Sequence, residues 1–282
     1  MQSFGLVINL GKKRVKKVTP ELINWLEARG KQVFLPINKA GILGCPERGI
    51  AEERLGETDC LIALGGDGTL LRAARLVSDS GTPILGVNLG HLGFLTEIEL
   101  GELYPALTEL LAGNFSIEER MMLQSEVLRE EKTLAGYRAL NDVVITKGAF
   151  SRMLRLEVYV RGAYLDTYPA DGLILSTPTG STAYSLSAGG PLVAPELEVT
   201  ILTPICPHTL YARPLVVPAG QEVRVHVHAQ GAEVMLTVDG QQGLHLQDGD
   251  VILVNRAHMP ARLVRLKERS FYALVREKLR EG

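Results

Sequence analysis

Hydrophobic residues in the first 115 positions follow two alternating patterns. Short apolar runs predict strands, and these runs occupy residues 4–10, 32–35, 60–64 and 83–88. Between them, apolar residues recur every three or four positions, which predicts helices at residues 19–30, 70–77 and 103–113. Strands alternating with helices are typical of a parallel sheet covered by helices, and such sheets bind ligands at the carboxyl ends of their strands.

The first of these helices has a clear signal at each end. Thr19 and Pro20 are typical of an N-cap followed by a first-turn proline, and Gly30 is typical of a helix end. The basic residues at 12–17 are then expected to form a solvated loop. Contact of this loop with a phosphate or an effector is the alternative.

After residue 115 the hydrophobic pattern changes to a period of two. Strand-like runs occupy residues 143–146, 154–160, 172–176, 223–227, 234–238 and 251–255. One helix-like insert at 181–188 interrupts them, and residues 270–280 again have a helical pattern. We therefore expect an α/β domain at 1–115 and a β-rich domain at 116–267, with a C-terminal helix at 268–282 that packs back on the first domain.

Composition narrows the class of protein without deciding it. Of the 282 residues 46% are hydrophobic and 22% are charged, and the formal net charge is −2, so no basic excess suggests nucleic acid or an anionic membrane as a partner. Three scattered cysteines predict neither a disulfide framework nor a zinc site. The first apolar run is too short for a signal peptide, and no run is long enough to span a membrane. A cytoplasmic protein is expected.

The most informative motif is Gly-Gly-Asp-Gly-Thr at 65–69, directly after the apolar run at 60–64. Glycines let backbone N–H groups approach a phosphate closely, and the N-terminus of the following helix favours an anion. An aspartate alone would repel phosphate, so Asp67 suggests a group that accepts a proton from an attacking hydroxyl or holds magnesium. The motif predicts phosphoryl transfer. A tight turn with Asp67 as the N-cap is the alternative.

Four other segments carry candidate chemistry, and each also has a plain structural interpretation. Residues 88–95 form a glycine-containing loop after a predicted strand, and Asn141-Asp142 could grip a diol or a base edge, or form a turn. Residues 171–191 are rich in hydroxyl groups, which can bond a base or sugar, and include Tyr184, whose ring can stack on a base. Asp239-Gly240-Gln241 is typical of a hairpin turn, with ligand contact as the alternative.

In this order the motifs resemble those of bacterial NAD kinases, the ATP-NAD kinase family. The resemblance extends over nearly the whole chain and includes residues 204–214. G-G-D-G-T alone is shared with diacylglycerol and sphingosine kinases, and in near form with phosphofructokinases of the same superfamily, whereas 171–191 together with 88–96 and 141–142 is more specific. The resemblance implies an α/β N-terminal domain, a β-sandwich C-terminal domain and a homodimer or homotetramer.

The activity implied by the resemblance is phosphorylation of the 2′-hydroxyl of the adenosine ribose of NAD to give NADP. The phosphoryl donor would be ATP or polyphosphate, and Mg²⁺ or another divalent cation would accompany it. Asp67 then matches the catalytic carboxylate, the general base. Gly68 and Arg72 match phosphate-side and nucleotide contacts, and Asn141 and Asp142 match the pair that holds the adenosine part of NAD.

The remaining matched positions concern the dinucleotide. Arg152 falls at a basic position associated with ligand binding, and Asp171 matches an acidic residue near the nicotinamide end. Gln241 matches a ligand contact late in the sequence. The start of the adenine-binding helix is matched by Thr182, Ala183, Tyr184 and Ser187. The resemblance implies no protein ligand to a metal.

Two other classes remain open from the residues. A lipid kinase of the same superfamily would need a large apolar acceptor pocket, which the hydroxyl-rich residues 176–187 disfavour. A non-catalytic dinucleotide-binding sensor would need no carboxylate at Asp67. The chain has no G-x-x-x-x-G-K-[ST] motif, and no G-x-G-x-x-G follows its first predicted strand, so neither a P-loop enzyme nor a hydride-transferring dehydrogenase is indicated.

Overall fold

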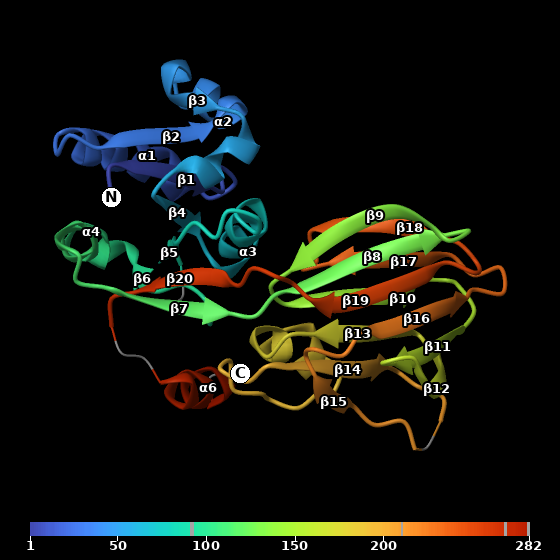
Figure 1. Ribbon diagram of the computed structural model, residues 1–282. Helices are drawn as coiled ribbons and strands as arrows, with labels where there is room; N and C mark the ends of the chain where they lie inside the picture. Colours follow the sequence, from blue (N-terminus) through green and yellow to red (C-terminus); the bar gives the residue numbers. More distant parts are fainter. Residues whose placement is uncertain (91–92, 210, 268–269, 281–282) are drawn as a thin grey trace. The chain divides into compact units, whose positions relative to one another are not determined.

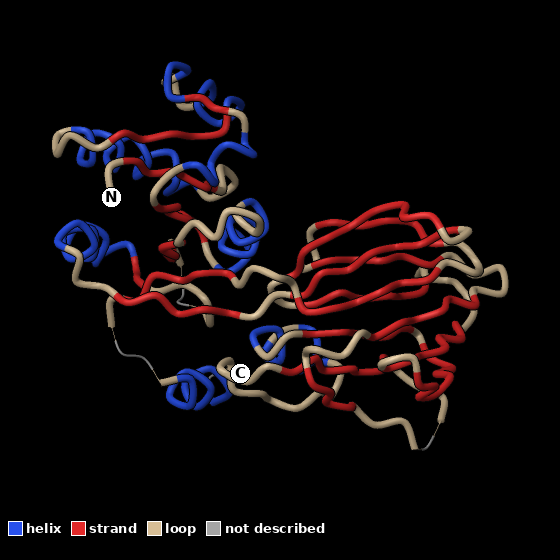
Figure 2. Tube along the Cα trace, viewed as in Figure 1, coloured by secondary structure: helices blue, strands red, loops and turns tan. Residues whose placement is uncertain are grey.

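The computed structural model describes residues 1–90, 93–209, 211–267 and 270–280, and it divides by contacts into two units (Figure 1). The first unit, here the α/β unit, comprises Met1–Glu119 and Met259–Gly282, and the second, here the β unit, comprises Arg120–His258. Figure 2 shows helices mixed with strands in the first unit and strands predominating in the second. In the described part of the chain, no helix is long and apolar enough to cross a membrane.

The α/β unit is built on an eight-stranded sheet with the order β3-β2-β1-β4-β5-β20-β7, and β6 pairs with β5. Strand β1 is parallel to β2 and β4, and β5 is parallel to β4, β6 and β20. The strands are β1 (Ser3–Ile8), β2 (Gln32–Pro36), β3 (Gly49–Ile50), β4 (Cys60–Gly65), β5 (Ile84–Asn88), β6 (Ile98–Glu99), β7 (Ser116–Arg120) and β20 (Ala261–Arg265). The predicted parallel sheet is confirmed.

Helices α1 (Lys13–Glu27) and α4 (Leu103–Ala112) of this unit each bury one apolar side in the core of the sheet. Leu22 of α1 and Leu107 of α4 are fully buried there, and the rings of Trp25 and Tyr104 lie 5.5 Å apart between the same two helices. Gly113, with φ of 85°, ends α4 as expected. The helices are α1 (Lys13–Glu27), α2 (Ile37–Ile42), α3 (Asp67–Leu76), α4 (Leu103–Ala112), α6 (Phe271–Arg280) and the 3₁₀ turns η1 (Pro46–Arg48), η2 (Glu52–Glu57) and η3 (Leu100–Glu102).

The start predicted for the first helix is wrong. Helix α1 begins at Lys13, so Pro20 lies inside it and most of the basic stretch is helical rather than a loop. Val15 and Val18 are buried and continue the apolar side of the helix backwards beyond Thr19. Burial of this extended side outweighs the hydrogen bond that Pro20 cannot donate.

Strand β20 shows how the end of the chain returns to the first sheet. It pairs with β5 and β7, and the buried carboxylate of Glu97 holds its end by accepting a bond from Arg265 Nη1 at 2.8 Å and from the N–H of Leu266 at 2.9 Å. We expected residues up to 267 to belong to the β-rich domain, whereas β20 completes the α/β sheet. The C-terminal helix exists as α6, and residues 268–269 and 281–282 of the predicted segment lie outside the described residues.

The β unit contains two six-stranded antiparallel sheets, with the orders β15-β14-β13-β10-β17-β18 and β12-β11-β16-β19-β8-β9. Alternate residues such as Leu154, Leu156 and Val158 are buried and join residues of the other sheet in one core. The predicted β-sandwich is confirmed. Its strands are β8 (Leu123–Arg129), β9 (Lys132–Ala139), β10 (Asp142–Lys147), β11 (Leu154–Val160), β12 (Ala163–Ala170), β13 (Gly172–Ser176), β14 (Val199–Ile205), β15 (Leu215–Pro218), β16 (Val223–His228), β17 (Val234–Val238), β18 (Gln242–Leu246) and β19 (Val251–Arg256).

Two short helical turns interrupt the strands of the β unit. They are η4 (Thr179–Thr182) and α5 (Tyr184–Ser187), and they follow β13 directly. They overlap the helix-like insert expected at 181–188, although the helical turns begin two residues earlier and are interrupted at Ala183.

Candidate active site

The glycine motif connects β4 to α3 at the carboxyl end of the parallel sheet, as the sequence predicted. Gly65 ends β4, Gly66 is the N-cap of α3 with no side-chain cap, and Asp67 is the first helical residue. A Cβ on Gly65 would lie 1.9 Å from Thr69 Oγ1, so only glycine permits this close approach. Gly68 is exposed in the first turn. The loop therefore presents backbone at the N-terminus of a helix, where an anion is favoured.

The carboxylate of Asp67 is held by the loop that follows β5. Its Oδ2 accepts the N–H of Phe94 at 2.8 Å, and its Oδ1 accepts those of Leu95 and Thr96, both at 3.2 Å. A Cβ on Gly93 would lie 2.1 Å from Asp67 Oδ1, so this glycine makes room for the carboxylate. The structure thus brings together two motifs singled out in the sequence, residues 65–69 and 88–96. His91 and Leu92 of the second motif lie outside the described residues.

Arg72 lies one turn further along α3 and forms an ion pair with Glu52 of η2. Both side chains are about one-third exposed, 31% and 30% respectively. The guanidinium is therefore oriented by a partner within the α/β unit.

Three sequence motifs of the β unit converge at one end of strands β10, β13 and β17. Asp239 accepts hydrogen bonds from three successive backbone N–H groups, those of Leu140, Asn141 and Asp142, at 3.1, 2.8 and 3.1 Å. On the other side of the Asn141 backbone, its carbonyl accepts the N–H of Thr177 at 2.9 Å. The pair Asn141-Asp142 is thus fixed from two directions, by the hairpin turn and by the start of the hydroxyl-rich segment.

Close packing of the backbone reinforces this arrangement. A Cβ on Gly180 would lie 2.1 Å from the carbonyl oxygen of Asn141. Thr177 Oγ1 donates to the Leu140 carbonyl at 2.6 Å and accepts the N–H of Gly180 at 3.0 Å. The predicted hairpin turn is confirmed, because Asp239 and Gly240 both have positive φ, 51° and 62°, between β17 and β18. Gln241 follows this turn with an exposed side chain.

The carboxyl group of Asp142 has an unusual environment. Burial, together with the negative charge of Asp239, raises its pKa from 3.8 to about 7. Asp142 therefore titrates near neutral pH, and it can either donate or accept a hydrogen bond there.

The hydroxyl-rich segment separates into buried and outward-facing residues. Ser181 Oγ accepts the N–H of Val193 at 3.1 Å, and Ser185 Oγ forms a hydrogen bond with Thr203 Oγ1 at 2.9 Å. These hydroxyl groups therefore stabilise the fold. Tyr184 is 43% exposed. The four residues matched to the adenine-binding helix are all exposed or half-buried and are Thr182, Ala183, Tyr184 and Ser187.

Asp171 and Arg152 lie at the opposite end of the same strands. Asp171 precedes β13, whose other end leads to Thr177, so about 17 Å of strand separates them at roughly 3.3 Å per residue. Lys147 Nζ lies 3.5 Å from Asp171 Oδ1 and donates to the carbonyl of Ser151, next to the exposed Arg152, at 3.2 Å. The structure therefore does not bring these two residues to the Asn141-Asp142 end within one chain.

Sequence reasoning missed three residues of these sites. Lys12 was assigned to a solvated loop, yet its Nζ donates to the carbonyl of Gly65 at 2.7 Å. Asp239 was interpreted as part of a hairpin turn, with ligand contact as the alternative, and Gly93 as part of a glycine-containing loop. Neither was predicted to position another site residue. Lys12 could have been predicted as a site residue from its position directly after the first strand, because ligands bind at the edge of the sheet formed by the carboxyl ends of the strands.

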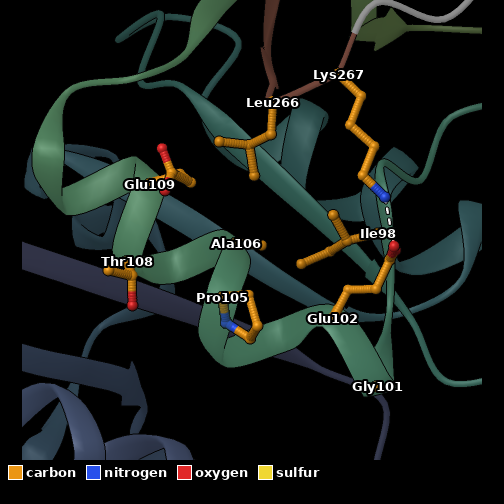
Figure 3. A pocket seen from close by; sticks show the side chains of 9 residues that line it. All are labelled: Ile98, Gly101, Glu102, Pro105, Ala106, Thr108, Glu109, Leu266 and Lys267. Atoms are coloured by element: carbon orange, nitrogen blue, oxygen red, sulfur yellow. Dashed lines mark hydrogen bonds and ion pairs between the residues drawn. The ribbon is translucent and has the colours of Figure 1, made fainter.

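The α/β unit also contains a pocket of about 550 Å³ that none of the predicted site residues lines. Figure 3 shows the side chains that line it, among them the apolar Ile98, Ala106 and Leu266, with the ion pair of Lys267 and Glu102 at one side. In the described part of the chain no three acidic, histidine or cysteine side chains cluster as metal ligands. An aspartate in a glycine loop at a helix N-terminus is typical of a phosphotransferase.

Comparison with known proteins identifies the family. The model of the ATP-NAD kinase N-terminal domain matches residues 4–115, and that of the ATP-NAD kinase C-terminal domain matches residues 140–266. An NAD kinase of Moorella thermoacetica is 70% identical over 282 residues, covering 100% of this chain and 90% of the relative. An NAD kinase of Caldanaerobacter subterraneus subsp. tengcongensis is 48% identical and is covered completely, as is this chain.

Two solved structures have the same fold over the whole chain. Yeast NADH kinase complexed with NADH has a TM-score of 0.90 at 28% identity, covering 99% of this chain and 87% of that one. An NAD kinase from Archaeoglobus fulgidus in complex with ATP has a TM-score of 0.78 at 26% identity, with both chains covered completely. The chain belongs to the ATP-NAD kinase family. It is a phosphotransferase that phosphorylates NAD, so the lipid-kinase and sensor alternatives are set aside.

Proposed function

We propose that the reaction transfers a phosphoryl group from ATP or polyphosphate to the 2′-hydroxyl of the adenosine ribose of NAD, with Asp67 as the general base. A ribose hydroxyl is a weak nucleophile at neutral pH, so a carboxylate that accepts its proton during attack on phosphorus accelerates the reaction by about 10²–10⁴-fold. The position of Asp67 at the end of β4, directly beside the glycines, is the observation that carries this proposal.

The hydrogen bonds of Asp67 are compatible with this role. Its Oδ2 accepts one N–H, that of Phe94, and a carboxylate oxygen has two lone pairs. A substrate hydroxyl can therefore bond the same oxygen while the loop keeps the carboxylate in place. Preorganisation of this kind avoids a rearrangement at the moment of reaction.

We assign the roles in substrate binding according to which candidate residues lie together in each unit. Gly68 and Arg72, with the backbone of the glycine loop, would bind the phosphates of the donor. Asn141 and Asp142 would hold the adenosine part of NAD, and Gln241 at the adjoining turn would add a contact. The adenine would stack on Tyr184 beside Thr182, Ala183 and Ser187.

Asp171 and Arg152 are proposed to contact the part of the dinucleotide remote from the adenine, Asp171 at the nicotinamide end. Their location at the other end of β13 and β10 supports a separate subsite. The negative Asp171 lies beside Lys147, which limits the net charge that a ligand there would meet.

A divalent cation would enter with the phosphate donor. The described residues offer no cage of three ligands, and Mg²⁺ commonly binds through substrate phosphates with few protein ligands. Its chemistry would be the neutralisation of charge on the transferred phosphoryl group.

Assembly and compartment are also proposals. Members of this family work as homodimers or homotetramers, and we propose one of these states here, which light scattering of the purified protein tests. The three cysteines are free thiols, two buried and one exposed, and this supports a reducing compartment such as the cytoplasm.

An assay of NADP formation from NAD, ATP and Mg²⁺ tests the proposed reaction. Replacing Asp67 by Asn should lower kcat by at least about 10²-fold while NAD binding survives. Asp59→Asn is a matched control, because Asp59 also accepts backbone N–H groups, those of Gln2 and Ser3, but at the opposite end of β4. An Asp67→Asn enzyme that keeps more than about a tenth of the wild-type kcat would exclude Asp67 as the base.

A further inference from the structure

Lys12 is held at the glycine loop by the fold of the α/β unit. It follows β1 at the carboxyl end of the sheet, and β1 pairs with β4 up to Ile8 and Leu64. The connecting loop is fixed by the N–H of Asn9, which donates to the Leu64 carbonyl at 3.4 Å, and by the N–H of Lys12, which donates to the Asn9 carbonyl at 3.1 Å. The backbone of Lys12 is therefore anchored beside the end of β4.

The ammonium group of Lys12 lies over the start of α3. Its Nζ donates to the carbonyl of Gly65 at 2.7 Å, and a Cβ on Gly66 would lie 3.4 Å from the same nitrogen. Gly66 is the N-cap of α3. A lysine ammonium has three N–H donors, so the bond to Gly65 leaves capacity for an anion.

Two sources of positive charge meet at this position. The N-terminus of a helix carries partial positive charge, and cations are normally found at the opposite end. The carboxylate in the first turn, Asp67, is directed to the N–H groups of Phe94, Leu95 and Thr96. The Lys12 ammonium and the partial positive charge at the N-terminus of α3 thus both lie near Gly66. A phosphate group bound there would stabilise this arrangement.

We propose that Lys12 binds the phosphate chain of the phosphoryl donor at the glycine loop. The ligand chemistry is a chain of linked phosphates, whether it comes from ATP or from inorganic polyphosphate. Arg14 extends the positive charge along the same edge of the sheet, because its Nη1 donates to the carbonyl of Leu89 after β5 at 3.4 Å. This inference rests on the donor-binding role proposed for the glycine loop, and it concerns binding rather than proton transfer.

The test compares Lys12→Met with Lys12→Arg and with the control Lys17→Met on the exposed side of α1. Calorimetric titration without NAD uses tripolyphosphate, ATP and adenosine as probes. Because a hydrogen bond from a charged group is lost, Lys12→Met should bind tripolyphosphate and ATP at least about tenfold more weakly. Lys12→Arg should retain most of the affinity, Lys17→Met should match the wild type, and adenosine binding should not change.

Steady-state kinetics add a second measurement. Lys12→Met should raise the KM for ATP by a similar factor and change the KM for NAD by less than about twofold. Unchanged affinity of folded Lys12→Met for both phosphate chains would overturn the proposal, and so would an equal rise in both KM values. Failure of Asp67 as the base would instead leave these titrations as expected, so the two proposals fail separately.

Discussion

Asp239 Oδ1 accepts the backbone N–H of Asn141 at 2.8 Å, although 98 positions separate the two residues in the chain. The same oxygen accepts the N–H of Asp142 at 3.1 Å. One carboxylate on a hairpin turn therefore sets the position of two residues proposed to hold the adenosine part of NAD. This relationship gives Asp239 a positioning role.

Replacing Asp239 by Asn should weaken both the fold and the binding of NAD. Asparagine accepts the left-handed backbone, so the change removes charge with little added strain. Hydrogen bonds to charged groups contribute about 1.5–3 kcal/mol each, and with an amide oxygen still present we expect a loss of about 1–3 kcal/mol in urea unfolding. The KM for NAD should rise several-fold.

Asp248→Asn is the matched control for that variant. Asp248 also accepts backbone N–H groups, those of Ala229 and Gln230, but at another turn of the β unit. It should lose stability without changing the KM for NAD. An unchanged KM for NAD in Asp239→Asn would contradict the positioning role.

The pKa of Asp142 predicts a stability that falls with rising pH. This pKa is raised from 3.8 to about 7 in the folded protein, so between these values the folded state binds more protons than the unfolded state. Its contribution to the free energy of unfolding then decreases as pH rises from about 4 to about 7, and is constant above that. Denaturant unfolding of wild type and Asp142→Asn at pH 5, 6, 7 and 8 measures it.

The comparison with Asp142→Asn isolates this carboxyl group from all others. The stability of the wild type relative to the variant should decrease from pH 5 to pH 7 and then level off. In Asp239→Asn the same transition should move to lower pH, because the repelling charge is gone. A difference that does not depend on pH would show that Asp142 does not titrate in this range.

Tyr184→Ala should weaken NAD binding by about 1 kcal/mol or more through loss of aromatic stacking. Its 43% exposure leaves the ring accessible to a base. Tyr184→Phe should bind nearly as well as the wild type. Tyr164→Ala, a control at an exposed tyrosine of β12, should not alter the affinity in the same titration.

Gly93→Ala should reduce kcat, because the new Cβ would meet Asp67 Oδ1 at 2.1 Å and displace the carboxylate or its loop. Gly90→Ala in the same loop is the control, since the nearest atom to its Cβ is Asn88 Oδ1 at 3.8 Å. We expect a kcat loss of at least about tenfold only for Gly93→Ala, measured as NADP formation. Equal activity of the two variants would contradict the close packing.

Local signals predicted those parts of the fold that depend on neighbouring residues. The continuous apolar run of β4 identified a strand buried along its whole length, and Asp239-Gly240 identified a hairpin. The hairpin of β8 and β9 was not predicted, because its turn uses Glu130 and Glu131 at φ of 50° and 61° in place of glycine or asparagine. Only the pairing of the two strands makes these conformations favourable.

For the site residues too, local sequence signals allowed a prediction and long-range contacts did not. The position of Asp67 could be predicted, because the glycines beside it in the sequence indicate a phosphate-binding loop between a strand and a helix. Lys12 and Gly65 are 53 positions apart in the sequence. Their contact can be predicted only if β1 and β4 are known to be neighbours in the sheet. Asp171 shares one sequence block with Tyr184, yet the length of β13 carries it to the other end of the sheet.

The strand order of the α/β unit has a consequence for synthesis on the ribosome. Among the described strands, β20 is the one neighbour of β7 in the order β5-β20-β7, and the whole β unit is translated between β7 and β20. At about 5–20 residues per second, roughly 7–30 s pass before β20 emerges. During that interval the nascent β7 has no partner in its sheet, and the sandwich has time to fold first. Fusing β20 directly behind β7 would therefore change the order of events during translation.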